Sequence, residues 1–248
     1  MNKSNVRRWA GRDLAWLAAF LLGGAGLYFS SNLSAETAFR IPPPAVDSRD
    51  LGASGPQTLV LAGGCFWGVQ GVFQHTRGVI QAVSGYAGGN SDTASYDKVT
   101  SGTTGHAESV QVTFDPAQVT YGQLLQIYFS VVHDPTQLNR QGPDVGSHYR
   151  SVIFYSDDAQ QQVARKYIEQ LDAAKAYPRR IVTQVTPLKG FYPAEAYHQD
   201  YATLHPESGY IAAFDLPKIA NLKTMFPDQY RDKPQLVGAA KSAGLVKP

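Results

Sequence analysis

Short apolar runs alternate with segments of helical periodicity between residues 58 and 185, and this alternation constrains the fold more than any other feature of the sequence. Strand-type and helix-type segments that take turns along a chain are typical of α/β domains. Strands are expected at residues 58–62, 79–86, 108–114, 151–155 and 181–185, and helices at 65–74 and after the candidate caps Thr120 and Ser156. The sequence therefore predicts an α/β (α+β) domain, and it leaves the order and direction of the strands open.

Two segments outside this pattern bound the domain. Residues 36–57 contain Pro42, Pro43 and Pro44 with scattered Gly and Ser, which is typical of a linker that is stiff in its proline part. Past Phe226 the chain carries Pro, Lys, Gly and Ala and resembles a loose tail. We therefore expect a linker at 36–57, one globular domain at 58–226 and a tail at 227–248.

The first 35 residues have the pattern of a targeting segment. The uncharged run 14–29 follows four basic residues, Lys3, Arg7, Arg8 and Arg12. Basic residues followed by an apolar run indicate a signal peptide or an uncleaved anchor, and the basic flank stays inside. The sequence thus predicts an exported protein, periplasmic or tethered to a membrane through residues 14–34. The alternative is a buried core helix in a cytoplasmic protein.

Composition and motif spacing exclude several classes of protein. A formal net charge of +2 from scattered residues is too small for a nucleic-acid-binding surface. One cysteine among 248 residues excludes an intrachain disulfide and a cysteine-rich zinc site. The six histidines show no metal-ligand spacing, and no phosphate-binding or dinucleotide motif is present. We therefore expect neither a bound metal nor a nucleotide cofactor.

The only cysteine, Cys65, lies in the segment GGCFWG at residues 63–68, between an expected strand and an expected helix. A lone cysteine is by default a small buried side chain without reactivity. At this junction, however, its sulfur would lie near a helix N-terminus, where free N–H groups and the helix dipole favour the thiolate. We therefore predict that Cys65 is an ionised, solvent-reachable nucleophile.

Two aromatic residues, Phe66 and Trp67, follow the cysteine directly. Either could be an ordinary core residue. At the C-terminal end of a strand, where open α/β sheets bind ligands, an aromatic wall suits a methyl or thioether group.

Glu108 has the same parity as Val110, Val112 and Phe114, so it begins the inward face of an expected strand. Burial raises the pKa of a carboxyl group, which can then donate a proton at neutral pH. The alternative is a side chain at the end of the strand that bends outward to water.

Five motifs together resemble the A-class peptide methionine sulfoxide reductases, over residues 58–210. They are GGCFWG at 63–68, SGYAGG at 84–89, Tyr96, SGTTGHAE at 101–108 and HDPTQLNRQGPDVGSHYRS at 133–151. The resemblance implies a two-layer sandwich around a mixed β-sheet. It also implies an enzyme that reduces methionine S-sulfoxide, free or in proteins, to methionine and so repairs proteins after oxidative stress.

The resemblance implies roles for the matched positions. Cys65 matches the nucleophile, which becomes a sulfenic acid, and Glu108 matches the acid that protonates the sulfoxide oxygen. Phe66 and Trp67 match the wall that receives the substrate methyl group. The residues that match those binding the oxygen and the site's water are Tyr96, Asp144 and Tyr149, and Tyr201 matches a further site tyrosine.

The chain departs from the family at one point. Many members carry a second cysteine in a Gly-Tyr-Cys segment, and here the matching residues are Gly209, Tyr210 and Ile211. We therefore expect no cofactor and an external thiol that reduces the sulfenic acid: thioredoxin, a thioredoxin-like protein, glutaredoxin or a small thiol. We expect the chain to act as a monomer on oxidised proteins or peptides that contain methionine sulfoxide.

Two hypotheses from other classes stay open. A Cys–His acyl hydrolase would need His198 within hydrogen-bond reach of Cys65 and no buried acid near the sulfur. A binding module would recognise methionine sulfoxide without turnover, because the recycling cysteine is absent.

Overall fold

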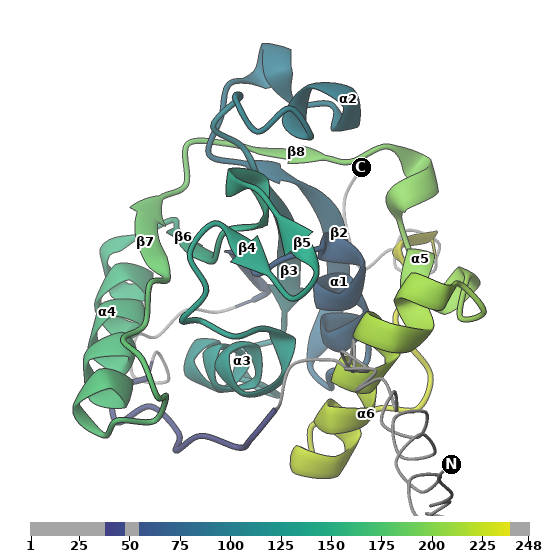
Figure 1. Ribbon diagram of the computed structural model, residues 1–248. Coiled ribbons are helices and arrows are strands. Elements are labelled where there is room, and N and C mark those ends of the chain that lie inside the picture. Colours follow the sequence, from purple (N-terminus) through teal and green to yellow (C-terminus); the bar gives the residue numbers. More distant parts are fainter. Residues whose placement is uncertain (1–37, 48–54, 239–248) are drawn as a thin grey trace, which may run out of the picture. The chain divides into compact units, whose positions relative to one another are not determined.

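A mixed β-sheet forms the centre of the computed structural model, which describes residues 38–47 and 55–238 (Figure 1). Within these residues six strands lie in the order β7-β6-β1-β3-β2-β8. β6 and β7 are parallel, and the other neighbours are antiparallel. Their bounds are β1 Gln57–Ala62, β2 Val79–Ala87, β3 Ala107–Phe114, β6 Val152–Tyr155, β7 Gln184–Pro187 and β8 Phe191–Pro193.

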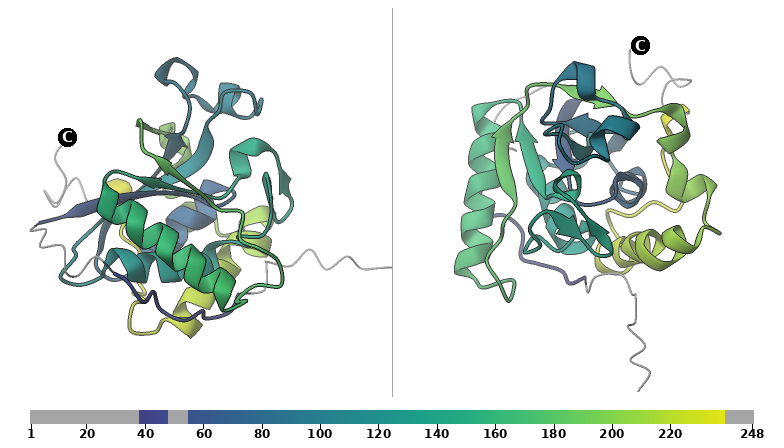
Figure 2. Two further views of the ribbon diagram at one scale, coloured as in Figure 1. Left: turned by 90° about the vertical axis from the view of Figure 1, so that its left-hand side faces the viewer. Right: turned by 45° about the horizontal axis from the view of Figure 1, so that its top comes forward.

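Helices cover one face of this sheet (Figures 1 and 2). They are α1 (Phe66–Gln74), α3 (Tyr121–Ile127), which continues as a π-helical turn at Tyr128–Val132, and α4 (Asp158–Ala173). Their apolar sides and the strands share one core, whose members include Leu61, Phe73, Val110, Leu125 and Tyr167. Each fully buried aliphatic or aromatic side chain contributes roughly 1.5–3 kcal/mol relative to exposure, so this core is the main source of stability.

The opposite face of the sheet carries a smaller apolar cluster. Leu188, which follows β7, and Phe191, the first residue of β8, pack against Val60, Ala62, Ala87, Ala107, Val152 and Phe154. The α/β class and the arrangement around a mixed sheet, both expected from the sequence, are confirmed.

Shorter elements complete the surroundings of α1. They are α2 (Tyr96–Val99), the hairpin of β4 (Arg140–Gln141) and β5 (Asp144–Val145), α5 (Tyr201–Leu204) and α6 (Leu216–Met225). Both α5 and α6 pack against α1. The hairpin lies within the motif segment 133–151, and neither β8 nor α6 was predicted.

The helix caps follow from their side chains. Thr120 caps α3 in a capping box, because its side chain accepts from the Gln123 amide while the Gln123 side chain accepts from the Thr120 amide. The cap predicted for α4 is wrong by one residue: Asp157, not Ser156, accepts a hydrogen bond from the Gln160 amide.

Residues 38–47, part of the segment expected to be a linker, pack against the helices. Ile41 is buried, and its carbonyl accepts from the Gln126 side chain at 2.7 Å. The Tyr167 hydroxyl donates to the Pro42 carbonyl at 2.7 Å. This part of the proline-rich segment is therefore bound to the domain, because its free carbonyl groups find donors on α3 and α4.

Residues 227–238 differ from the expected loose tail in the same way. Thr76 and Tyr230 pair across the end of α1, and the Arg231 amide donates to the His75 carbonyl at 2.8 Å. The Arg231 guanidinium also donates to the Thr76 carbonyl. Main-chain pairing needs no apolar sequence, which is why composition did not reveal it.

The predicted leader, residues 1–35, lies outside the described residues. Among the residues that the structure does describe, no helix is long and apolar enough to cross a membrane.

Candidate active site

Cys65 is the N-cap residue of α1, directly after the turn that follows β1. Gly64 makes this turn with a φ of +88°, and a Cβ there would lie 2.7 Å from the Gln141 Cβ. Glycine is therefore required both for the backbone conformation and for the close approach of β4. The predicted strand-to-helix position of Cys65 is confirmed, although the residue is only 8% exposed.

Glu108 lies on the helix-covered face of β3 and is 2% exposed. Its Oε2 accepts a 3.0 Å hydrogen bond from the backbone N–H of Phe66, the residue after Cys65. Burial raises the pKa of Glu108 to about 8, against the effect of that N–H donor, and two further negative charges raise it in the same direction, Asp144 and Asp215. The structure thus places the inward-facing acid that strand parity predicted at the first turn of the helix that Cys65 caps.

The resting ionisation predicted for Cys65 is wrong. Burial raises the pKa of the Cys65 thiol well above its usual value, and the negative charges of Glu108 and Asp215 raise it further. A hydrogen bond from the Trp67 backbone and the cation of Lys218 lower it by less. Desolvation of an anion outweighs the favourable helix dipole here, so the thiol keeps its proton at neutral pH.

The two aromatic residues after Cys65 lie at different depths. Phe66 is buried, with its ring centroid 6.0 Å from that of Tyr86 and 5.1 Å from that of His198. Trp67 is half-buried and stacks on Tyr201, with 4.0 Å between centroids and 15° between the ring planes. The Trp67 Nε1 donates to His198 Nδ1 at 3.3 Å, and the two ring planes are tilted by 37°. Together they form an apolar wall beside the sulfur.

Three tyrosine hydroxyl groups lie within electrostatic reach of the sulfur. Burial raises the pKa of Tyr96, Tyr149 and Tyr210, and negative charge on Cys65, when its thiol is ionised, raises each further. The Tyr210 hydroxyl donates to Asp144 Oδ2 in a short hydrogen bond. All the site residues predicted from the sequence therefore come together around the β1–α1 turn.

Sequence reasoning missed two residues of this site. Tyr210 lies in the segment Gly209–Ile211, which was matched above to the family's Gly-Tyr-Cys segment only to show that the cysteine is absent. Glu195 accepts hydrogen bonds from the Tyr86 hydroxyl at 2.8 Å and from the Tyr96 amide at 3.0 Å, and so holds Tyr96 in place. The Gly-Tyr pair could have indicated Tyr210, whereas nothing local marks Glu195.

The geometry bears on the alternatives as well. The described residues contain no group of three or more His, Cys, Asp or Glu side chains able to hold a metal ion. His198 Nδ1 is already bonded to Trp67, and the buried acid Glu108 lies at the turn that carries Cys65. The hydrolase hypothesis required the absence of such an acid, so the site does not meet its condition.

One helix N-terminus thus carries a buried thiol, a carboxyl group that keeps its proton at neutral pH, and an aromatic wall. This combination is that of a thiol-dependent reductase. The sequence model of the family described as peptide methionine sulfoxide reductase matches residues 57–230. The chain therefore belongs to the peptide methionine sulfoxide reductase family. It reduces methionine S-sulfoxide to methionine by thiol chemistry, which is the repair of oxidised proteins.

Individual relatives agree with this assignment. The chain is 61% identical over 190 residues to peptide methionine sulfoxide reductase MsrA 2 of Mesorhizobium japonicum, covering 77% of this chain and 97% of that one. It is 48% identical over 195 residues to an MsrA 2 of Synechocystis sp., covering 78% and 89%. Among solved structures, methionine sulfoxide reductase A of Corynebacterium diphtheriae is 34% identical with a TM-score of 0.57, covering 70% of this chain and 89% of that one. The reduced form of Mxr1 from Saccharomyces cerevisiae is 31% identical with a TM-score of 0.57, covering 71% and 94%.

Proposed function

We propose that Cys65 attacks the sulfur of methionine S-sulfoxide and that Glu108 protonates the sulfoxide oxygen. The observation that carries this proposal is the 3.0 Å hydrogen bond from the Phe66 amide to Glu108, which holds the acid at the first turn of the helix that Cys65 caps. An acid is needed because unprotonated oxide is a very poor leaving group.

Cys65 and Glu108 share one negative charge in this mechanism. Once the pair has lost one proton, near the Glu108 pKa of about 8, the thiol proton passes to the Glu108 carboxylate, the thiolate attacks, and the carboxylic acid delivers the proton to the oxygen. The attack forms a bond between the Cys65 sulfur and the substrate sulfur, and the protonated oxygen leaves the substrate sulfur as hydroxide. The hydroxide then bonds to the Cys65 sulfur while the sulfur–sulfur bond breaks and its electron pair stays on the substrate sulfur, so the sulfoxide is reduced to the thioether and Cys65 is oxidised to a sulfenic acid. A raised thiol pKa is consistent with this order of steps, because the thiolate then forms only when its proton passes to Glu108, which becomes the acid that the next step needs.

The remaining site residues bind the substrate in this proposal. Trp67, held by its stack on Tyr201, and Phe66 receive the substrate methyl group through apolar contact. The hydroxyl groups of Tyr96 and Tyr149 bind the sulfoxide oxygen, and the Asp144 carboxylate holds the hydroxyl of Tyr210 at the same site.

The direct test is the substitution Cys65→Ser. The variant and the wild type are incubated with a methionine sulfoxide peptide and dithiothreitol, and methionine is quantified by mass spectrometry. We expect no reduction above the protein-free background, because serine at neutral pH is a poor nucleophile toward sulfur. Appreciable turnover by the folded variant would refute the nucleophile assignment.

We also propose that an external thiol restores Cys65. The chain has no second cysteine, so the thiolate of thioredoxin, a thioredoxin-like protein, glutaredoxin or a small thiol attacks the sulfenic sulfur. This step releases water and forms a mixed disulfide, which a second thiol then reduces. Turnover with each candidate in turn, at equal thiol concentration, identifies the reductant.

We further propose that the enzyme is exported, periplasmic or membrane-anchored through residues 14–34, and that it acts as a monomer. The basic residues before an uncharged run support export, and one chain supplies the entire site. Cell fractionation with mass spectrometry of the N-terminus tests the location, and light scattering tests the monomer. Full-length enzyme confined to the cytoplasm, or a stable dimer, would contradict the respective part.

A further inference from the structure

A buried ion pair beside Cys65 has no role in the mechanism above. Asp215 is 0% exposed, and its Oδ2 has no hydrogen-bond partner in the described part of the chain. Its Oδ1 lies 3.2 Å from the Nζ of Lys218, whose side chain is 12% exposed. A buried carboxylate with an unpartnered oxygen is destabilising, so a functional reason for this placement is to be sought.

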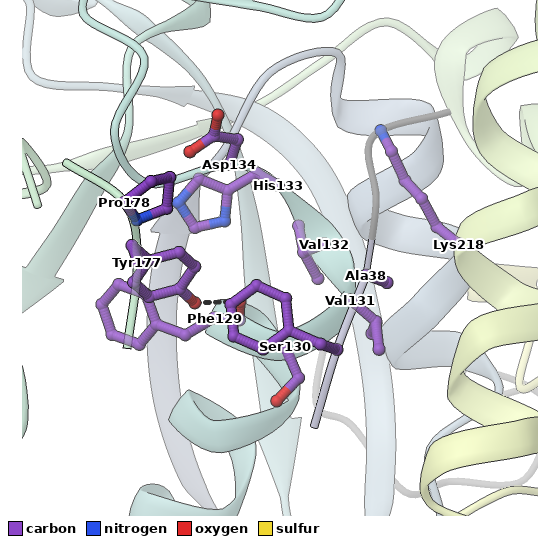
Figure 3. A pocket seen from close by; sticks show the side chains of 11 residues that line it. Ala38, Phe129, Ser130, Val131, Val132, His133, Asp134, Tyr177, Pro178 and Lys218 are labelled. Atoms are coloured by element: carbon purple, nitrogen blue, oxygen red, sulfur yellow. Dashed lines mark hydrogen bonds between the residues drawn. The ribbon is translucent and has the colours of Figure 1, made fainter. Parts of the chain in front are cut away.

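Lys218 pairs with Asp215 and also lines an apolar cavity. The cavity has a volume of about 290 Å³. Figure 3 shows the Lys218 amine across the cavity from the aromatic residues Phe129 and Tyr177, which also line it. The Asp215 carboxylate therefore holds the Lys218 ammonium group in an ion pair.

Asp215 occupies the space of a missing side chain in the first turn of α1. Gly68 is the third residue of this helix, and a Cβ there would collide with Asp215 Oδ1 and lie 3.0 Å from Lys218 Nζ. In a capping box this third position carries an acidic or amide side chain that faces the N-cap residue, which here is Cys65. Because α1 has no acid in its own first turn, Asp215 supplies one from the distant helical turn Ile211–Asp215.

Three acidic groups therefore share one helix N-terminus: the Cys65 sulfur, Glu108 on the Phe66 amide, and Asp215 beside Gly68. A negative charge on any one makes a charge on the others less favourable. The titratable and charged groups that act on the sulfur from the surrounding elements are Glu108 of β3, Asp215, Lys218 of α6, Tyr96, Tyr149 and Tyr210.

We propose that Asp215 is a positioning residue for sulfoxide reduction: held by Lys218 against Gly68, it limits the negative charge on the Cys65 sulfur in the resting enzyme. The proposal rests on the role proposed above for Cys65. A protonated resting thiol reacts slowly with oxidants. This protects an enzyme that lacks a second cysteine, because its sulfenic acid cannot be captured in an intrachain disulfide before further oxidation.

Ionisation of Cys65 can be measured directly because it is the only thiol in the chain. The full-length protein is alkylated with iodoacetamide at a series of pH values, and the rate is followed by intact mass spectrometry. In Asp215→Asn we expect the midpoint of the rate profile to fall by about one pH unit, because the substitution removes a buried negative charge that acts on the sulfur. Below the wild-type midpoint this corresponds to about tenfold faster alkylation.

Two further variants make the test specific. Asp232→Asn removes an exposed carboxylate that pairs with Lys223 of the same helix α6 at 3.0 Å, and it should leave the midpoint unchanged. The double variant Asp215→Asn with Lys218→Met removes both buried charges, and its midpoint should lie between those of Asp215→Asn and the wild type. If the single variant does not fold, the double variant carries the test.

An unchanged or raised midpoint in folded Asp215→Asn, or an unchanged midpoint in the double variant if only that protein folds, would overturn the proposal. A purely structural role of Asp215 would change the melting temperature without moving the midpoint. The outcome is independent of the proposed function, because alkylation reports the thiol whether or not Cys65 is the nucleophile. The Cys65→Ser assay addresses that role separately.

Discussion

Burial acts on Cys65 and Glu108 in the same direction, and each keeps its proton at neutral pH as a result. An anion in a low-dielectric site loses hydration that the Phe66 and Trp67 amides only partly replace. The two groups can therefore hold one negative charge between them more easily than two. This single shared charge is the state from which attack and oxygen protonation both proceed.

Glu108→Gln should reduce the rate of sulfoxide reduction by roughly 10²–10⁴-fold, the usual contribution of a general acid. The amide keeps the shape of the side chain and a partner for the Phe66 amide, but it cannot deliver the proton. The measurement is methionine formation under saturating peptide. Glu169→Gln, on the exposed side of α4, serves as the control and should be neutral; an unaltered rate in Glu108→Gln would move the acid role to a tyrosine.

The rate of reduction should rise with pH through about 8. Below that pH both Glu108 and Cys65 are protonated, and loss of the first proton, near the Glu108 pKa of about 8, creates the reactive one-charge state. The pKa of Cys65 lies well above its usual value, so the rate should stay high beyond this point. Single-turnover assays of the reduced enzyme, without added thiol, avoid the ionisation of the reductant. A rate that falls through pH 8 would contradict the shared-charge mechanism.

At the scale of elements, the turn between β1 and α1 places the sulfur. It is tight because the backbone of Gly64 has a positive φ and the hairpin residue Gln141 lies against it. The same helix start is contacted from β3 by Glu108 and from the turn before α6 by Asp215. Four segments of the chain thus meet at one helix N-terminus.

Gly64→Ala should lower the free energy of unfolding by about 1–3 kcal/mol from backbone strain, plus the cost of the contact with Gln141, and should reduce activity. Gly55→Ala is the matched control, because Gly55 has the same φ of +88° and a Cβ there would meet no atom within 4 Å. Chemical denaturation of both variants separates strain from collision. Equal losses in the two would show that Gln141 does not constrain the turn.

The whole molecule contains one thiol, and this limits what it can do without a reductant. Each chain can supply one pair of electrons from Cys65 and then stops as a sulfenic acid. The rest of the catalytic cycle must come from outside the chain.

The reduced enzyme, freed of small thiols, should therefore form one methionine per chain and no more, since it has one cysteine. Addition of dithiothreitol should restart turnover. The measurement is methionine yield against protein concentration, together with trapping of the sulfenic acid by dimedone. The Cys65→Ser protein gives the zero line, and a yield well above one without thiol would contradict the single-thiol cycle.

Local patterns were sufficient for the strand-to-helix position of Cys65 and the inward direction of Glu108. Both follow from periodicity within a few residues, which burial enforces along a strand or a helix. They were insufficient for α6, β8 and the docking of residues 38–47 and 227–238. These depend on main-chain and side-chain partners far away in the sequence, which no window of neighbouring residues contains.

The sequence by itself determined the chemistry available to this protein: one nucleophile, an acid on the inner face of the next but one strand, and an aromatic pair beside the cysteine. Only the tertiary structure decided how that chemistry is held at rest. Cys65 is protonated and not ionised, because its pKa depends on burial and on the charges of Glu108 and Asp215. Those charges reach the sulfur from distant segments, so they exist as neighbours only after the chain has folded.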